Sequence, residues 1–282
     1  MDRVTTARAA RERVRKDRAA GRSIGLVPTM GALHAGHLSL LNRARAECGT
    51  VVLSVFVNPL QFGPAEDFAA YPRDLETDAR LAREAGADVL FAPAAEEIHR
   101  TGHRTRVEIE GMQEVLCGRS RPGHFRGVVT VVAKLLVLVR PDRAYFGEKD
   151  AQQLRLVRTM ARDLHLETEI VPCPTVREPD GLALSSRNAY LSPAERRAAP
   201  VLHRALHAAA ARAREGERDA RLLVAGVRAA LAAEPLARID YVEAVDSETL
   251  EPVIAIDRPV LLAVAAWFGK ARLIDNVVIE PL

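Results

Sequence analysis

Short apolar runs alternate with longer amphipathic segments through the first 172 residues of the chain. The apolar runs predict strands, and the segments with a helical period predict helices. We expect strands at 23–28, 50–57, 88–92, 142–146 and 167–172, and helices at 5–20, 37–48, 74–85, 127–139 and 150–165. Segment 127–139 reads as a buried helix, although its valines also allow a strand. Strands that alternate with helices predict a parallel sheet with helices on both faces.

Near residue 192 the pattern changes to helices followed by strands. Ser192, Pro193 and Glu195 form a helix-capping sequence, and we expect that helix to continue to Arg214. A second helix follows Asp219, and strands are expected at 239–245, 259–267 and 272–279. The chain is therefore expected to be an α/β protein, with a parallel-sheet domain over 1–186 and a smaller α+β lid domain over 187–282.

Composition narrows the class of protein. The chain has 282 residues, 48% of them hydrophobic, and a net charge of +3. Because its basic residues are mixed with acids and form no block, the charge weighs against a nucleic-acid partner. Three scattered cysteines form neither a metal spacing nor a disulfide framework, which favours a reducing cytoplasm. The N-terminus lacks the apolar core of a signal peptide, and the longest apolar run is too short to span a bilayer, so no membrane partner is expected.

Two histidines, His34 and His37, follow the strand expected at 23–28, with Gly31 and Gly36 around them. A helix that starts near Gly36 would place both rings beside its N-terminus, where free N–H groups and the helix dipole attract anions. This arrangement predicts a triphosphate site. A structural pair of histidines is one alternative, and a zinc site is another, although no third ligand lies at a recognisable spacing.

A second motif closes the strand expected at 50–57. Asn58 and Gln61 are neutral amides that both donate and accept hydrogen bonds, so they suit a ligand with hydroxyl and carboxylate groups. Because Asn-Pro and glycine also mark ordinary turns, a simple turn is the alternative. Pro28, Met30 and Phe62 could pack on an apolar part of the same ligand.

A third motif, containing Lys149 and Asp150, follows the strand expected at 142–146. Lys149 is one of four lysines among 40 basic residues, which suggests a need for a compact point charge. Asp150 could cap the next helix or hold a hydroxyl or a metal, and a capped helix with an ordinary ion pair is the alternative. These motifs all follow strands, and ligands bind at the carboxyl ends of parallel strands.

A fourth motif, at 180–188, contains Ser185, Ser186 and Arg187 and suits a mobile phosphate-binding loop. Lys134 is a lone charge on an apolar helix, and we expect it to extend to solvent. No partners are evident for five further histidines, which we interpret as surface residues: His99, His103, His165, His203 and His207. His124 precedes the apolar helix and could line the pocket.

Together these motifs resemble those of the pantothenate synthetase (pantoate–β-alanine ligase) family. The matching segments are PTMGALHAGH at 28–37, FVNPLQFG at 56–63, RPGHFRGV at 121–128, FGEKD at 146–150 and DGLALSSRNAYLS at 180–192. The resemblance implies a Rossmann-like N-terminal domain, a smaller C-terminal lid and a cytoplasmic homodimer. It also implies that pantoate, β-alanine and ATP, with Mg²⁺, are converted into pantothenate, AMP and diphosphate through a pantoyl adenylate.

The resemblance also implies roles for individual residues. His37 would be the proton donor, with His34 and Lys149 beside it, while Gln61 would contact pantoate and β-alanine and Gln153 would contact pantoate. Asn58, Pro28 and Met30 complete the substrate site that we expect from the residue types. The ATP contacts implied are Met30, Gly31, His34, Gly36, His37, Gly147, Glu148, Lys149, Asp150, Val176, Leu184, Ser185, Ser186 and Arg187. No protein side chain is assigned as a metal ligand.

Two positions depart from the family pattern. Ala151 stands where the family usually has an aromatic residue, and Leu184 stands where methionine is common. Neither change removes a charged or hydrogen-bonding group. The alternatives to a ligase are a nucleotidyltransferase that acts on a phosphorylated substrate, which would need more basic residues, and a non-catalytic nucleotide-sensing or RNA-binding protein.

Overall fold

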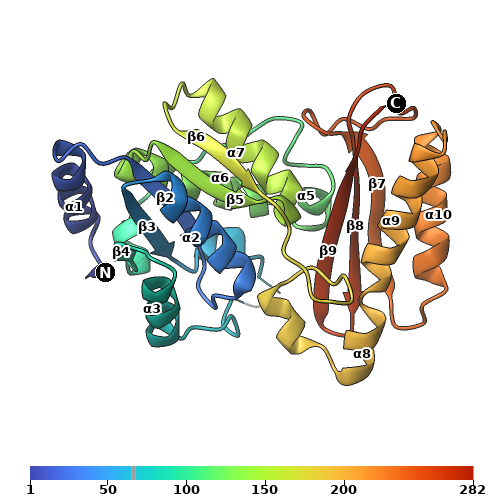
Figure 1. Cartoon of the computed structure of the whole chain (residues 1–282), viewed down its shortest axis with the longest axis horizontal. Helices are drawn as coiled ribbons and strands as arrows, with labels where there is room; N and C mark the ends of the chain where they lie inside the picture. The colour runs from blue at the N-terminus through green and yellow to red at the C-terminus, as the bar shows by residue number, and fades with distance from the viewer. Residues whose placement is uncertain (65, 67, 282) are drawn as a thin grey trace.

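In the computed structural model, which describes residues 1–64, 66 and 68–281, the chain forms one six-stranded and one three-stranded sheet (Figure 1). The first sheet has the order β1-β4-β3-β2-β5-β6, and all of its pairings are parallel. Its strands are β1 (Asp2–Val4), β2 (Ile24–Thr29), β3 (Thr50–Val55), β4 (Val89–Phe91), β5 (Arg143–Gly147) and β6 (Glu169–Cys173). The predicted α/β class is confirmed.

Helices cover both faces of this sheet. The helices are α1 (Ala7–Ala19), α2 (Ala35–Glu47), α3 (Leu75–Glu84), α4 (Ala95–Ile98), α5 (Cys117–Ser120), α6 (His124–Val139) and α7 (Ala151–Asp163). Buried residues of α1, α6 and α7 pack together with one face of the strands, and those of α2 and α3 pack on the other. The apolar segment 127–139 is therefore a helix, and it is apolar on most sides because it lies between the sheet and other helices.

The second sheet, with the order β7-β8-β9, is antiparallel. Its elements are β7 (Arg238–Asp246), β8 (Val260–Phe268) and β9 (Ala271–Ile279), preceded by α8 (Pro193–Ala198), α9 (Val201–Arg214) and α10 (Ala220–Ala232). One face of the sheet packs on α9 and α10. Residues of the other face, such as Tyr241 and Leu261, join the core around α6 and α7. Because successive side chains of a strand point to opposite faces, one face of the three-stranded sheet packs on α9 and α10 and the other packs near α6 and α7.

Several predicted boundaries were wrong. The single helix expected from Ser192 to Arg214 is two helices, because Pro200 lacks an N–H and starts α9 rather than continuing α8. The helix expected from 37 begins at Ala35. The helix expected from 150 begins at Ala151, after a 3₁₀ turn η2 (Glu148–Asp150). Strand β1 was missed because three residues are too few to show a period.

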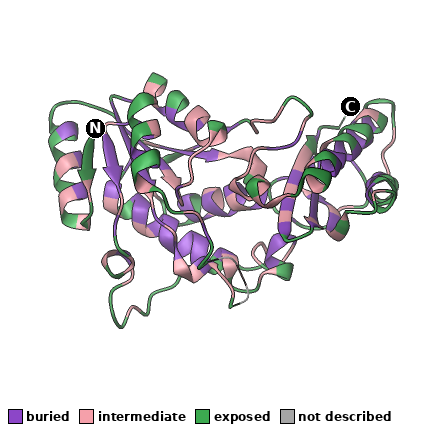
Figure 2. Cartoon of the chain, turned by 90° about the horizontal axis from the view of Figure 1, so that it is seen from below, coloured by how far each residue is buried: buried purple, intermediate pink, exposed green. Residues whose placement is uncertain are grey.

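Buried residues run along the strands and the inner faces of the helices, and exposed residues cover the outer faces (Figure 2). No helix within the described ranges is long and apolar enough to cross a membrane.

Gly127 brings α6 against the 3₁₀ turn η1 (Pro59–Gln61), which carries Gln61. A Cβ at Gly127 would lie 2.6 Å from the Gln61 nitrogen and would overlap the Leu60 carbonyl. The Gly127 carbonyl also accepts a hydrogen bond of 3.1 Å from Asn58 Nδ2. The absence of a side chain at this position therefore fixes the distance between the helix and the turn.

We predict that Gly127→Ala lowers the free energy of unfolding by about 1–3 kcal/mol, the usual cost of overpacking a well-filled core. The matched control is Gly226→Ala in α10, where the nearest neighbour is the flexible end of Arg212. Alanine should stabilise that helix by up to about 1 kcal/mol. Thermal unfolding of both variants measures the difference, and equal melting temperatures would contradict the close approach.

Candidate active site

The loops that follow β2, β3, β5 and β6 meet at the carboxyl edge of the parallel sheet. They surround a cavity of about 240 Å³. Of the residues singled out from the sequence, those that line the cavity are Pro28, Met30, His34, Gly36, His37, Gln61, Phe62, His124, Gly147, Lys149, Asp150, Gln153, Val176, Leu184, Ser185, Ser186 and Arg187. The structure thus brings together motifs that are up to 159 positions apart in the chain (187 minus 28).

The N-terminus of α2 is capped by the two histidines. His34 Nδ1 accepts a hydrogen bond of 3.1 Å from the Gly36 N–H, and His37 Nδ1 accepts one of 3.3 Å from the His34 N–H. The ring centroids lie 4.1 Å apart. Since each Nδ1 is an acceptor, the proton of each neutral ring is on Nε2, and both residues present an N–H donor beside the cavity.

Both imidazoles are neutral at pH 7. Burial, reinforced by the positive charge of Lys149, lowers the pKa of His34 to about 4. Burial lowers the pKa of His37 to about 3, with smaller contributions from His34 and Lys149. The site therefore combines uncharged donors from the histidines with the charge of Lys149.

The loop before α2 is held by Asp78, a buried residue of α3 that the sequence did not single out. Its carboxylate accepts hydrogen bonds from the N–H groups of Ala32 (3.0 Å) and Leu33 (2.8 Å). Gly31 has a φ of +84°, and a Cβ there would lie 2.7 Å from Asp78 Oδ2. Gly31 does not line the cavity, so its effect on a ligand is through the shape of this turn.

Asn58, which was expected to contact substrate, lies behind Gln61 and is not among the residues that line the cavity. Only 1% of Asn58 is exposed, and its amide is fully used. Its Nδ2 donates to Gln61 Oε1 at 3.1 Å, and its Oδ1 accepts from the Leu60 N–H at 3.3 Å. Gln61 itself reaches the cavity, with Nε2 3.0 Å from the sulfur of Met30.

Lys149 is carried by the turn η2, and a residue of the second sheet holds this turn. Asn276 Nδ2 in β9 donates to the carbonyl oxygens of Glu148 (3.1 Å) and Lys149 (3.0 Å). Glu148 does not line the cavity, and Asp150 precedes α7 without capping it through its side chain. The three-stranded sheet therefore holds the turn that carries Lys149.

A larger cavity of about 900 Å³ lies between α5, the start of α7 and the three-stranded sheet. The residues that line both cavities are Arg121, His124, Lys149, Asp150, Gln153, Ser185 and Arg187. Ala151 lines this larger cavity and is buried. Leu184 lines the smaller one.

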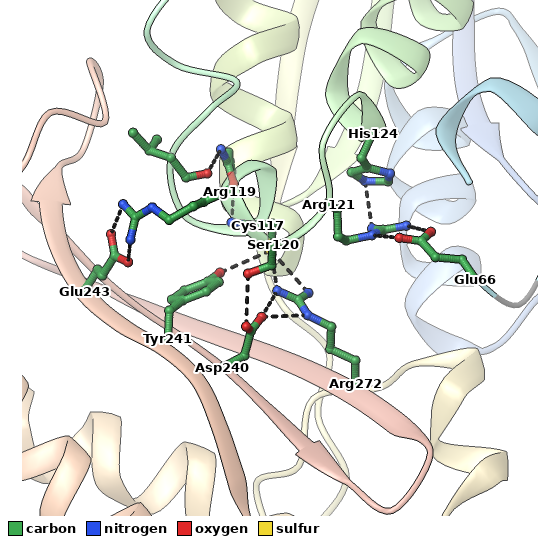
Figure 3. A network of polar contacts seen from close by, with 12 residues as sticks. Glu66, Cys117, Arg119, Ser120, Arg121, His124, Asp240, Tyr241, Glu243 and Arg272 are labelled. Atoms are coloured by element: carbon green, nitrogen blue, oxygen red, sulfur yellow. Dashed lines mark hydrogen bonds and ion pairs between the residues drawn. The ribbon is translucent and has the colours of Figure 1, made fainter. Parts of the chain in front are cut away.

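A polar network joins α5 to the three-stranded sheet (Figure 3). The guanidinium of Arg119 pairs with Glu243 at 2.7 Å, and Ser120 Oγ donates to Asp240 at 3.0 Å. Arg272 binds the same Asp240 at 2.6 Å and also contacts Cys117 at 3.4 Å. These residues form no recognisable local motif, because the contacts between α5 and the three-stranded sheet join positions more than 100 apart in the chain.

Several residues expected at the surface have partners inside. Lys134 Nζ donates to the Ile98 carbonyl at 2.7 Å and contacts His99 Nδ1 at 3.2 Å, so it does not extend to solvent. His99 Nε2 lies 2.8 Å from Asn58 Oδ1. His203 is half-buried against Gly181, whereas His165 and His207 are exposed as expected.

Within the described part of the chain, no group of three or more His, Cys, Asp or Glu side chains is arranged to hold a metal ion. Asp150 is the one carboxylate among the described residues that line the smaller cavity.

Comparison with known proteins agrees with this geometry. The family model described as pantoate-beta-alanine ligase matches residues 2–278. The chain belongs to the pantoate–β-alanine ligase family. It is 56% identical to a pantothenate synthetase of Moorella thermoacetica over 99% of both chains. Its structure matches the crystal structure of pantothenate synthetase from Thermus thermophilus with a TM-score of 0.93, 52% identity and full coverage of both chains.

A second solved structure is that of pantoate-beta-alanine ligase from Francisella tularensis. It matches with a TM-score of 0.80 and 33% identity, and the match covers 99% of this chain and 97% of that one. That protein is described as complexed with beta-gamma ATP and beta-alanine. The family and the enzyme class implied by the sequence motifs are confirmed.

His124 provides a test of the charge state inside the site. Its Nδ1–H donates to the Gln61 carbonyl at 2.7 Å, and its Nε2 accepts from Arg121 at 2.9 Å, while Arg121 pairs with Glu66. Burial, reinforced by the charge of Arg121, lowers the pKa of His124 to about 3. The ring must therefore stay neutral to keep both hydrogen bonds.

We predict that stability falls as the pH drops from about 6.5 toward 4. In this window the unfolded chain binds protons at His34, His37, His99 and His124, but the folded chain does not, so stability rises with pH. His124→Gln removes one of these four groups and should make the dependence of the free energy of unfolding on pH less steep by about that share. Unfolding at a series of pH values measures the slope, with exposed His165→Asn as control. A slope unchanged by His124→Gln would show that the buried ring does not contribute.

Proposed function

We propose that this chain condenses (R)-pantoate with β-alanine to form pantothenate, with cleavage of ATP to AMP and diphosphate through a pantoyl adenylate. The observation that carries the proposal is the single cavity in which the N-terminus of α2, Lys149 and Gln61 face one another. The first two suit the phosphates of a nucleotide, and Gln61 suits an oxygen-rich acid. The complex of the Francisella relative with ATP and β-alanine supports the same pair of ligands here.

The nucleotide would bind along the edge formed by α2, η2 and the loop before η3 (Ser186–Tyr190). His34 and His37 would donate from Nε2 to phosphate oxygens, and Lys149 and Arg187 would add positive charge. Ser185 and Ser186 would donate hydroxyl groups, and Gly36, Gly147, Val176 and Leu184 would leave room for the nucleoside. Mg²⁺ would enter as part of the MgATP substrate. With Asp150 the one carboxylate among the described lining residues, phosphate oxygens would be its main ligands.

Pantoate would occupy the inner part of the cavity. Gln61 Nε2 and the Gln153 amide would bind its carboxylate and hydroxyl oxygens, and Pro28, Met30 and Phe62 would pack on its apolar dimethyl carbon. Asn58 would contribute indirectly, since its amide holds the amide of Gln61.

Two displacement steps account for the products. A pantoate carboxylate oxygen attacks the α-phosphorus of ATP, forming a P–O bond while the bond to diphosphate breaks. The neutral amine of β-alanine then attacks the acyl carbon, the C–O bond breaks, and AMP leaves as the amide forms and the amine loses its proton. The histidine and lysine donors stabilise charge on the transferring and leaving phosphates. Because His37 is neutral, it acts here as a hydrogen-bond donor rather than as a cation.

Water must be excluded while the mixed anhydride exists. The domain expected at 187–282 would cover the adenylate, and the hydrogen bonds from Asn276 in β9 to the turn η2 support this role. We further propose that the chain acts as a homodimer in a reducing cytoplasm, a setting that suits its three buried free cysteines.

The function is tested by measuring AMP and diphosphate release from MgATP with pantoate and β-alanine, supplied singly and together. The proposal requires sustained AMP release only when both are present. Turnover with a phosphorylated acceptor but not with pantoate would instead favour the nucleotidyltransferase alternative.

We predict that His37→Ala and Lys149→Ala each lower kcat by about 10²–10⁴, the range for the loss of a proton-transfer or charge-stabilising group. Each variant removes a hydrogen-bond donor from the edge along which the nucleotide would bind, and neither residue lies in the parallel sheet. Steady-state rates with saturating substrates measure the effect, with Lys16→Ala on α1 as a control that should keep the parent rate. Near-parental rates in both site variants would refute these roles.

We predict that Gln61→Ala raises the KM for pantoate by about tenfold or more while the KM for ATP changes little. In the proposed complex the amide binds the acid and makes no hydrogen bond to the nucleotide, and a tenfold change corresponds to about 1.4 kcal/mol. Initial rates at varied pantoate and at varied ATP separate the two constants. An unchanged KM for pantoate together with an unchanged kcat would remove Gln61 from the substrate site.

A further inference from the structure

A row of hydrogen-bonded polar side chains leads from Lys134, in the middle of α6, to Gln61 at the cavity. It starts at Lys134, whose Nζ donates to the Ile98 carbonyl at 2.7 Å and lies 3.2 Å from His99 Nδ1. An ammonium group has three donors and no acceptor. The contact with Lys134 therefore requires His99 Nδ1 to be the acceptor.

The second member of the row, His99, is neutral at pH 7. Burial lowers its pKa to about 4, and the charge of Lys134 acts in the same direction. A neutral imidazole has one ring proton, and with Nδ1 accepting, that proton is on Nε2. His99 Nε2 lies 2.8 Å from Asn58 Oδ1, so this bond runs from the imidazole to the amide oxygen.

Asn58 accepts a hydrogen bond from His99 and donates one to Gln61, so every hydrogen bond in the row is donated toward the cavity. Its Oδ1 is an acceptor for both His99 and the Leu60 N–H, which leaves its Nδ2 to donate. The recipients are Gln61 Oε1 and the Gly127 carbonyl, each at 3.1 Å. Three contacts thus agree on the orientation of an amide whose oxygen and nitrogen could otherwise exchange places.

The hydrogen bond from Asn58 fixes the orientation of the Gln61 side-chain amide. Its oxygen is used by Asn58, and its nitrogen lies at the cavity, 3.0 Å from Met30 Sδ. A ligand at this position therefore meets N–H donors. The reverse orientation would present an acceptor and would favour a ligand with N–H or O–H groups to donate.

We propose that Lys134 and His99 are positioning residues that fix the direction of the Gln61 amide, so that the site selects a ligand with oxygen acceptors at this point. In this reaction that ligand is pantoate, so the inference rests on the proposed function and deepens it. Neither residue lines the cavity, and both act through Asn58. Loss of Lys134 removes the group that fixes the tautomer of His99 and leaves Nδ1 without its donor.

The test compares Lys134→Met, which keeps the apolar stem and removes every donor, with Lys134→Arg, which keeps a cation that only donates. We expect Lys134→Met to raise the KM for pantoate about 3- to 10-fold, the effect of one net hydrogen bond, with the KM for ATP unchanged. Lys134→Arg should restore most of the parent value. Lys16→Met, on the exposed side of α1, is the matched control for loss of a lysine.

A double-mutant cycle separates positioning from general packing. If Lys134 acts through the Gln61 amide, Lys134→Met should have no further effect on the KM for pantoate in a Gln61→Ala background. An equal effect in both backgrounds, or equal rises in the KM for pantoate and for ATP, would overturn the proposal. Melting temperatures of all variants monitor folding.

A spectroscopic readout does not depend on activity. Long-range ¹H–¹⁵N NMR of the intact enzyme distinguishes the two neutral tautomers of His99. We expect the Nε2–H form in the parent enzyme and a detectable Nδ1–H population in Lys134→Met. A parent enzyme with the Nδ1–H form would overturn the proposal. If Gln61→Ala alone leaves the KM for pantoate unchanged, the assignment of Gln61 to the pantoate site fails. The tautomer of His99 would still show whether the hydrogen bonds from Lys134 to Gln61 are donated toward the cavity.

Discussion

The parallel pairing of β2 with both β3 and β5 is the constraint on which the rest of the structure depends. It places the ends of three strands at one edge, so the loops after Thr29, Val55 and Gly147 must share one space. The residues in these loops have no other reason to meet, because they come from segments far apart in the chain. Asp78, Gly127 and Asn276 then fix the details, each by holding a loop from a neighbouring element.

Burial decides the charge of the site. His34, His37, His99 and His124 all have pKa values well below the usual value, so each ring is neutral and has one donor and one acceptor. Their acceptors are used by protein groups, and their donors point toward protein oxygens or the cavity. In the proposed complex, only the His34 and His37 donors would reach phosphate, and because these rings are neutral they would join Lys149 and Arg187 there without creating a buried excess of positive charge. The same neutrality gives each hydrogen bond a defined direction.

Sequence periodicity predicted the two-sheet architecture, and short motifs identified most of the residues that line the cavity. The helix starting beside His34 could be predicted because strand, glycine and histidine lie next to one another. The role of Asp78 could not be predicted, because its partners are 45 and 46 positions away and a single carboxylate on a helix has no distinctive pattern. Lys134 was misjudged for a related reason. A lysine on an apolar helix usually reaches solvent, and only the tertiary fold brings the Ile98 carbonyl and His99 to it.

The central claim is that the cavity joins an acid to the α-phosphate of ATP before the amide forms. The most direct measurement uses pantoate labelled with ¹⁸O in both carboxylate positions, with mass analysis of the products after turnover with MgATP and β-alanine. An adenylate predicts one ¹⁸O in AMP, one retained in the amide carbonyl of pantothenate and none in diphosphate. Label in diphosphate would mean that the carboxylate attacks another phosphorus atom, and unlabelled AMP and diphosphate would mean that no acyl phosphate forms. Either result would contradict this account.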